Sequence, residues 1–414
     1  AAERKQSQHT NNRGLLLYRA KHKRRKMDDQ NMDKKCVGII AEYNPFHNGH
    51  LYHLEQSLSA TGAEFAVVAM SGNFVQRGQM AVADKWERAE AAVKSGADLV
   101  VEIPAVFACN SAPVFAQAAV EILENLGADW ISFGSESGNI GDLREISREI
   151  SCGTEAGRVE EIIKQKVREG LSYPRARREA VAVVLGDEIA SLLDMPNNIL
   201  AVEYLKNMKR AEAVTIKREG AGHDDMETKN GFASAAAIRA KLKAGGSVAG
   251  WLPQTSEKML QKAHVPSEET LFQMICQKTL TTPAEQLDSV FSGGEGLGNK
   301  LKKIIRKTAS LDELGEELKS KRYTRTRIDR FLMHVLLDIM QPESYGNYIR
   351  VLAFSERGSA YLKEIKKREL SALPIITNIN KDIQPGGKAY AALEKDILAA
   401  DLYNLASGRD LYKN

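Results

Sequence analysis

Two histidines, His47 and His50, are the residues in this sequence of 414 whose types and spacing most directly indicate chemistry. They flank Asn48-Gly49, after the apolar run Val37–Ala41 and before a helical pattern, Leu51–Leu58. Strand, turn and helix in this order form phosphate sites in α/β folds, because the free N–H groups and positive dipole end of the helix attract anions. Imidazoles there donate hydrogen bonds to phosphate oxygens and to charge that develops at phosphorus. The motif therefore predicts a catalytic phosphate site.

The spacing His-x-Gly-His taken alone also fits two ordinary surface histidines near a turn. Its position at a strand–helix junction favours the phosphate site, and Gly49 lets the backbone approach a ligand closely.

The elements that must position these histidines alternate between strand and helix from Met32 onward. Bounded apolar runs predict further strands at Phe65–Met70, Leu99–Ile103, Trp130–Phe133 and Ala213–Ile216. Because helical patterns lie between them, we expect an α/β fold with a Rossmann-like, doubly wound parallel sheet. Ligands bind such sheets at the carboxyl ends of strands. At or near those ends the sequence places His47, His50, Ser71-Gly72, Glu102-Ile103-Pro104 and Gly134-Ser135.

The sequence changes character near residue 250. Gly245-Gly246 and Pro253 mark a boundary, and beyond it strand signals are scarce while helical periodicity recurs. We therefore expect a basic, disordered extension at 1–31, a catalytic α/β domain at 32–250 and a mainly α-helical C-terminal domain at 251–414.

A dense basic run, Lys319–Arg327, lies in this helical part and is expected to begin a helix. A solvated helix face is the alternative, but few acidic residues interrupt the run, which favours contact with RNA or phosphate. Tyr323 offers a ring for stacking on a base. The residues expected to contact RNA are Lys321, Arg322, Tyr323, Arg325 and Arg327.

Composition limits the class of protein. A hydrophobic fraction of 43% and a charged fraction of 27% are typical of a globular protein, and no apolar run approaches the roughly 18 residues of a membrane helix. The four cysteines form no Cys-x-x-Cys pair, which favours a reducing cytoplasm. P-loop, Gly-x-Ser-x-Gly and His-Glu-x-x-His motifs are absent. His223 beside Asp224 and Asp225 is better explained as a polar loop than as a metal site, so no metal-ligating residues are predicted.

The net charge of +4 depends on the first 31 residues, which hold nine Lys and Arg against three acidic residues. The remaining chain has a net charge of −2, so RNA binding must rest on local clusters. Residues 1–31 fit a nucleic-acid-binding tail, a targeting segment or sequence upstream of the true start. Met32, just before the first strand, favours the third interpretation.

Several motifs in order give the chain a specific resemblance. They are EYNPFHNGHLYH (42–53), MSGNFVQRG (70–78), FGSESG (133–138), PNNIL (196–200), ASAAAIR (233–239) and SKRYTRTRI (320–328). With these motifs the sequence resembles the HIGH-type nucleotidyltransferase superfamily and, within it, the bacterial tRNA(Met) cytidine acetate ligase family. The resemblance implies that ATP, accompanied by Mg²⁺, activates acetate as acetyl-adenylate and releases pyrophosphate. The acetyl group then passes to the wobble cytidine of elongator tRNA(Met), in the cytoplasm and without a membrane.

The resemblance also assigns residues. His47 and His50 would be catalytic, and the basic run would hold tRNA. The ATP site would comprise Ile40, Ala41, Glu42, Tyr43, Asn44, Pro45, Phe46, His47, Asn48, Gly49, His50, Leu51, Tyr52, His53, Gly134, Asn197, Arg218 and Glu219. The sequence departs from the family at Ala236, where the family more often has Thr in Ser-x-Thr-x-Ile-Arg, so one hydroxyl near the nucleotide is lost.

Two other functions remain open from the sequence. An adenylyltransferase acting on a small phosphate acceptor would use the same histidines, but would not need a large helical part with a basic run. A nucleotide-regulated RNA-binding protein without turnover is favoured by Ala236 and disfavoured by the intact His47, Gly49 and His50.

Overall fold

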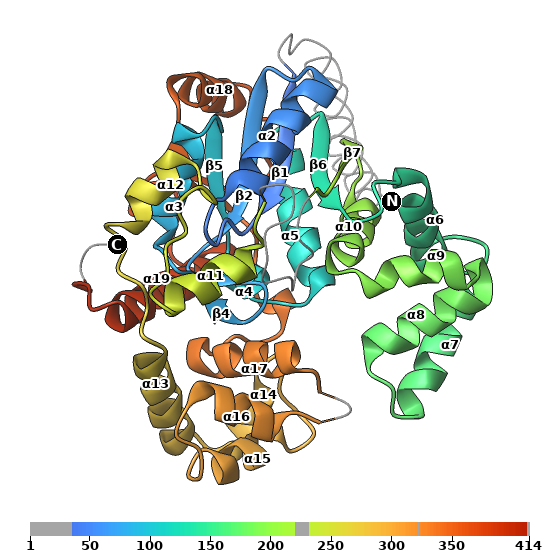
Figure 1. Cartoon of the computed structure of the whole chain (residues 1–414), viewed down its shortest axis with the longest axis vertical. Helices are drawn as coiled ribbons and strands as arrows, with labels where there is room; N and C mark the ends of the chain where they lie inside the picture. The colour runs from blue at the N-terminus through green and yellow to red at the C-terminus, as the bar shows by residue number, and fades with distance from the viewer. Residues whose placement is uncertain (1–34, 220–231, 321–322, 412–414) are drawn as a thin grey trace, which may run out of the picture.

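The computed structural model describes residues 35–219, 232–320 and 323–411, and its centre is a seven-stranded sheet (Figure 1). The strand order is β7-β6-β1-β2-β5-β8-β9, parallel throughout except between β5 and β8. The strands are β1 (Cys36–Ala41), β2 (Phe65–Ser71), β5 (Leu99–Ile103), β6 (Trp130–Ser135), β7 (Glu212–Lys217), β8 (Ile349–Phe354) and β9 (Ile375–Ile376). The predicted doubly wound parallel α/β sheet is confirmed.

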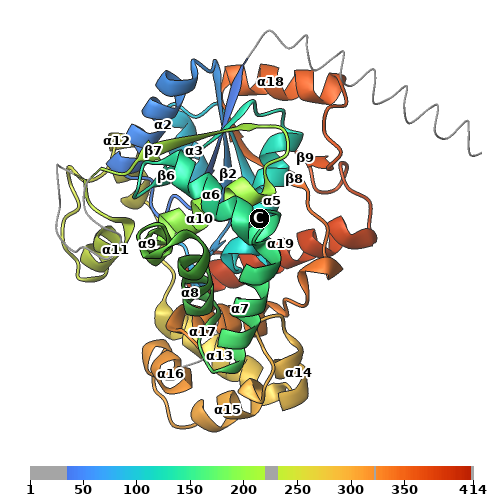
Figure 2. The same cartoon turned by 90° about the vertical axis from the view of Figure 1, so that its right-hand side faces the viewer.

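Side chains that point alternately to the two faces of the buried strands form a hydrophobic core on each face of the sheet. In β2, Ala66 and Val68 pack with α2 (Asn48–Thr61) and α3 (Lys85–Lys94), whereas Phe65 and Val67 join the cluster that contains α5 (Ala112–Asn125). Successive side chains of a strand point to opposite faces, so both faces of this sheet need helices to cover them. The view turned by 90° shows the helices on both sides of the sheet (Figure 2).

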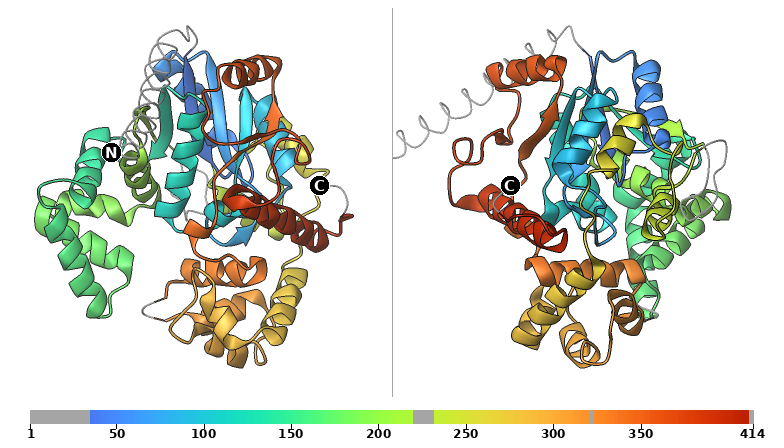
Figure 3. Two further views of the ribbon diagram at one scale, coloured as in Figure 1. Left: turned by 180° about the vertical axis from the view of Figure 1, so that it is seen from behind. Right: turned by 60° about the vertical axis from the view of Figure 1, so that its left-hand side comes forward.

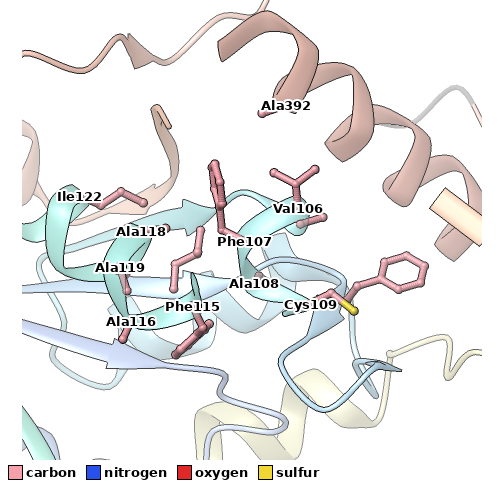
Figure 4. Packing of buried hydrophobic residues seen from close by; sticks show 14 of the residues in the cluster. Val106, Phe107, Ala108, Cys109, Phe115, Ala116, Ala118, Ala119, Ile122 and Ala392 are labelled. Carbon is pink, nitrogen blue, oxygen red and sulfur yellow. The ribbon is translucent and has the colours of Figure 1, made fainter. Parts of the chain in front are cut away.

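The second core continues from the sheet into the C-terminal helix. Side chains of α4 (Ala105–Ala108) and α5 lie between the sheet and α19 (Gly387–Ala406), where Phe107 and Val106 point toward Ala392 (Figure 4). The Asp396 carboxylate on α19 accepts a 2.6 Å hydrogen bond from the backbone N–H of Ala105. The end of the chain is therefore part of the α/β body.

Two helical lobes project from this body (Figure 3). The first contains α6 (Ile140–Ser151), α7 (Ala156–Arg168), α8 (Tyr173–Leu185) and α9 (Asp187–Ser191), and the chain returns through η1 (Leu192–Asp194) to α10 (Pro196–Asn207). The second contains α13 (Glu268–Thr281), α14 (Ala284–Ser289), α15 (Leu297–Ile304), α16 (Leu311–Leu318) and α17 (Arg325–Leu337). The remaining elements are β3 (Phe74–Val75), β4 (Gln79–Met80), α11 (Ala235–Lys243), α12 (Gln254–Leu260), η2 (Pro342–Ser344) and α18 (Glu356–Lys367).

The helical C-terminal part is confirmed, but the sequence analysis missed β8, which pairs antiparallel with β5. The run IRVLAF is short and follows a long helical stretch, and its strand character depends on the edge of β5 that it completes. The division into 32–250 and 251–414 stays a prediction. In the described part of the chain, no helix combines the length and the apolar character that a membrane span needs.

Candidate active site

A cavity of about 350 Å³ lies at the carboxyl ends of β1, β6 and β7, beside the N-terminus of α2. It brings together most residues of the predicted site: Ile40, Ala41, Glu42, Tyr43, Asn44, His47, Gly49, His50, Tyr52, His53, Gly134, Asn197, Arg218 and Glu219. Four residues of the predicted ATP loop do not line it. Phe46 is fully buried and Leu51 packs beside it in the core, Pro45 is buried, and the Asn48 amide donates to the carbonyl of Gly250.

The two histidines are fixed by the first turn of α2. The backbone N–H of His47 donates to Nδ1 of His50 at 3.3 Å, and the two rings stack with their centroids 3.7 Å apart. Because Nδ1 of His50 accepts this bond, the neutral ring carries its proton on Nε2. Nδ1 of His47 is buried and has no hydrogen-bond partner among the described residues. The described residues therefore leave Nδ1 of His47 without a protein partner and place the proton of His50 on Nε2.

Burial keeps the histidines of the cavity neutral. It lowers the pKa of His47 to about 3 and that of His53 to about 4, and in both cases the nearby Arg218 lowers the pKa further. The pKa of His50 is also lowered well below its ordinary value, chiefly by burial and then by His47. At neutral pH the imidazoles are uncharged hydrogen-bond donors, and the positive charge of the cavity comes from arginines.

These depressed pKa values predict how stability depends on pH. Between pH 6.5 and about 4 the unfolded histidines bind protons that the folded ones do not, so the free energy of unfolding should fall as pH is lowered through this range. Each buried histidine adds up to about 1.4 kcal/mol per pH unit to the slope. Urea unfolding at pH 7.5, 6.5 and 5.5 measures it. His53→Asn should flatten the slope and His264→Asn, at an exposed position, should not; equal slopes would contradict the assignment.

Glu136, which the sequence analysis missed, joins β6 to the start of α10. Its carboxylate accepts hydrogen bonds from the Asn197 side chain at 2.6 Å and from the backbone N–H of Asn198 at 2.9 Å. In return, Oδ1 of Asn198 accepts from the backbone N–H of Glu136 at 3.0 Å. This reciprocal arrangement places Asn197 at the cavity. A Cβ on Gly134 would lie 3.2 Å from Cγ of Arg218, so a side chain there would crowd the aliphatic part of that arginine.

The ASAAAIR motif supplies the helix N-terminus that faces the cavity from α11. Ser234 caps the helix by accepting from the backbone N–H of Ala237 at 3.0 Å, and Arg239 donates to the carbonyl of Asn44 at 2.9 Å. Ser234 and Ala235 line the cavity, whereas Ala236 does not. The departure from the family pattern therefore falls one residue outside the cavity wall.

A further set of lining residues was also missed, on the other side of the cavity. Gln76 and Arg77 come from the turn between β3 and β4, and Thr326 and Arg330 come from α17. Arg77 lies inside the motif MSGNFVQRG. This motif contributed to the family resemblance, but no residue in it was predicted to belong to the site. Nothing in the sequence shows which face of α17 meets the cavity, because that depends on how the helical lobe docks.

Of the residues of the basic run that the structure describes, only Thr326 lines the cavity. Lys321 and Arg322 lie outside the described residues. Arg325 is held by Asp329 and Asp312 at 2.8 Å and by Glu316 at 3.1 Å, which favours a role within the lobe. The guanidinium of Arg327 stacks 4.4 Å above the ring of Tyr323, whose hydroxyl donates to Glu295. RNA contact by this run stays a prediction.

Comparisons with known proteins extend over nearly the whole chain. A family model described as HIGH Nucleotidyl Transferase matches residues 34–413. A protein of Caldanaerobacter subterraneus subsp. tengcongensis named tRNA(Met) cytidine acetate ligase is 40% identical over 395 residues, which cover 92% of this chain and 96% of that protein. A Thermoanaerobacter sp. protein of the same name is 41% identical and covers 91% and 96%.

Solved structures agree with these relatives. The apo crystal structure of Thermotoga maritima TmcAL is similar with a TM-score of 0.83 and 30% identity, over 90% of this chain and 95% of that one. A second TmcAL structure, bound with alpha-thio ATP, is similar with a TM-score of 0.82 and 29% identity over the same shares of the two chains.

Proposed function

Because the chain belongs to the tRNA(Met) cytidine acetate ligase family of HIGH nucleotidyltransferases, we propose that its cavity uses ATP to activate acetate and acetylates the wobble cytidine of elongator tRNA(Met). The observation that carries the proposal is the pair of neutral, stacked histidines at the N-terminus of α2, in one cavity with Gly134, Asn197 and Arg218. An adenylation site needs these parts: donors for the phosphates and a surface for the nucleoside.

We propose one orientation of ATP from the chemistry of the residues around the cavity. The nucleoside lies toward β6 and α10, where Gly134 leaves room and Asn197 offers an amide. The phosphates lie between the N-termini of α2 and α11, next to His47, His50 and Ser234. Two helix N-termini attract negative charge from opposite sides, and Arg218 and Arg239 add full positive charges.

In the first step an acetate oxygen attacks the α-phosphorus, a new P–O bond forms and pyrophosphate leaves with the electrons of the broken bond. Negative charge grows on the non-bridging and leaving oxygens. The imidazole of His50, with its proton on Nε2, donates to these oxygens without needing to lose or gain a proton. The side chain is already oriented by His47, so little reorganisation accompanies the reaction.

In the second step the exocyclic amine of the cytidine attacks the carbonyl carbon of acetyl-adenylate. A C–N bond forms, the C–O bond of the mixed anhydride breaks, and AMP leaves while the amine loses one proton. The base must be unstacked to reach the cavity. A base in an anticodon loop is single-stranded, which lowers that cost.

The same proposal covers Mg²⁺ and the place of the reaction in the cell. The cavity offers the carboxylates of Glu42 and Glu219, and no group of three or more metal-ligating side chains occurs among the residues with described positions. This suits Mg²⁺ that arrives on the ATP phosphates and would neutralise part of their charge. His223, Asp224 and Asp225 lie outside the described residues.

We assign the reaction to the bacterial cytoplasm, where tRNA is modified, and expect no membrane partner.

One assay tests the function against its two rivals. The enzyme is incubated with ATP, labelled acetate and bacterial tRNA, and the tRNA is digested and searched for N4-acetylcytidine. Label in cytidine is the expected result. Pyrophosphate release that requires a small phosphate acceptor would identify an adenylyltransferase, and ATP binding without turnover would identify a regulated RNA-binding protein.

Glu136→Ala is expected to weaken ATP binding without changing the chemistry. The substitution removes the acceptor that places Asn197, so the KM for ATP should rise about tenfold while kcat changes little, as for loss of a hydrogen bond to a charged group. Steady-state pyrophosphate exchange measures both constants. Glu161→Ala, on the exposed surface of α7, is the control with an unchanged KM. A fall in kcat at unchanged KM would contradict the positioning role.

A further inference from the structure

We propose that Arg77 and Arg330 form an anion subsite on the acceptor side of the cavity, and that it holds a backbone phosphate of the acceptor RNA beside the target cytidine. This inference rests on the proposed function. It gives a role to the motif MSGNFVQRG, which contains none of the residues predicted to bind ATP.

The two arginines lie across the cavity from the residues assigned to the nucleoside. Gly134 lies near the end of β6 and Arg218 follows β7, on one side of β1 in the sheet. Arg77 follows β2, on the opposite side of β1, and Arg330 reaches the cavity from α17. In a doubly wound sheet the two halves on either side of the switch point bind different parts of the ligand set. We therefore assign the side of the cavity that carries Arg77 to the acceptor RNA.

Neither arginine has a direct ion pair with a carboxylate among the described residues. The described residues provide no side-chain hydrogen bond or ion pair for Arg77, and Arg330 has only a 3.5 Å contact to the carbonyl of Gln76. Asp329, next to Arg330 in sequence, is already bonded to Arg325. Burial lowers the pKa of Arg330, the charges of Arg327 and Arg77 lower it further, and the charge of Asp329 acts in the opposite direction. Two guanidinium groups near one another, one of them largely desolvated, are stabilised by an anion that bonds to both.

A backbone contact fixes the two arginines relative to each other. A Cβ built on Gly78 would lie 2.4 Å from the backbone N of Arg330 and 2.5 Å from the carbonyl carbon of Asp329. Gly78 also has a φ of +80°, which favours glycine. The turn that carries Arg77 therefore rests directly on α17. The subsite spans the joint between the α/β body and the helical lobe, as a bound RNA strand would.

The chemistry of the first step argues against acetate as the occupant. A guanidinium pair would stabilise the free carboxylate more than the neutral acyl group that replaces it in the adenylate. Such binding would lower the ground state and slow activation. A phosphodiester keeps its charge throughout acetyl transfer, and Thr326, one turn before Arg330 on α17, adds a hydroxyl donor at the same wall.

Arg330→Gln and Arg77→Gln test the subsite with two assays on the full chain. Acetate-dependent exchange of pyrophosphate into ATP, without tRNA, should stay within about twofold of the wild type. Acetylation at subsaturating tRNA should fall at least about tenfold, and the salt dependence of tRNA binding, log K against log salt, should lose a slope of about one. Arg175→Gln, exposed on α8, is the matched control and should behave as the wild type.

Other outcomes overturn the inference. A raised KM for acetate in the exchange assay would make this an acetate subsite, and a raised KM for ATP would assign it to the triphosphate. Unchanged acetylation and salt slope in both variants would remove any role. Arg77 lies on a turn, so its variant keeps the test valid if Arg330→Gln lowers the melting temperature. A wild-type enzyme that acetylates no tRNA would contradict the proposed function instead, and the salt slope of tRNA binding would still decide the subsite.

Discussion

His50→Ala is expected to reduce acetate-dependent pyrophosphate exchange by roughly 10²–10³-fold, the usual cost of removing one donor to developing negative charge. The ring is held by the His47 backbone and stacked on the His47 ring, so its Nε2–H is oriented before the substrates bind. Alanine removes the donor but leaves the helix N-terminus, which retains part of the phosphate binding. The loss should therefore appear mainly in kcat and much less in the KM for ATP.

The control for this prediction is a buried histidine that lies outside the cavity. His334 contacts the carbonyl of Cys109 through Nε2 at 2.7 Å, and burial lowers its pKa to about 4. His334→Asn should lower stability and leave exchange unchanged in the protein that remains folded. The affinity of His50→Ala for tRNA should equal that of the wild type. If tRNA affinity collapses while pyrophosphate exchange persists, the role given to His50 is wrong.

The features of the site that depend on local structure could be predicted from the sequence. The strand before His47, the turn at Asn48-Gly49 and the helix after it lie within 20 residues, so periodicity and turn chemistry were enough to predict them. The carboxyl ends of β1 and β6 follow from the same alternation. The fold class and the family predicted from these motifs are confirmed.

The features that were missed depend on contacts between distant segments. Arg330 reaches the cavity only because α17 rests on Gly78, more than 250 residues earlier, and a helix pattern alone does not show which polar face turns inward. The carboxylate partners of Arg325 were missed as well, because Asp312 and Glu316 lie on α16, outside the basic run. Strand β8 was missed because its pairing partner, β5, lies in the other half of the chain.

Lys85→Met is expected to lower the free energy of unfolding by about 3–5 kcal/mol, because it leaves a buried carboxylate without its main partner. Lys85 Nζ lies 2.7 and 2.9 Å from the two oxygens of Glu102, and both side chains are 2% exposed. The remaining cation, Arg350, is 3.6 Å from the carboxylate and cannot replace two short bonds. Urea unfolding at pH 7.5 measures the change.

The same helix supplies a matched control. Lys94, also on α3, pairs with Glu90 at 2.5 Å, but both side chains are about 60% exposed. Lys94→Met should change the free energy of unfolding by no more than about 0.5 kcal/mol, because water screens the exposed pair. Equal losses for the two variants would show that burial does not set the strength of the Lys85–Glu102 pair.

The consequence of Lys85→Met for activity follows from where Glu102 lies. It stands at the carboxyl end of β5, where β8 pairs with the sheet and where a Cβ on Gly72 would lie 2.3 Å from its Oε1. An unpaired carboxylate there would disturb the segment that leads from β2 to Arg77, while β1 and the His47–His50 turn lie on the other side of β2. Any residual defect in the folded variant should therefore affect acetyl transfer to tRNA before it affects pyrophosphate exchange, and the reverse order would contradict the placement of the acceptor on the β2 side.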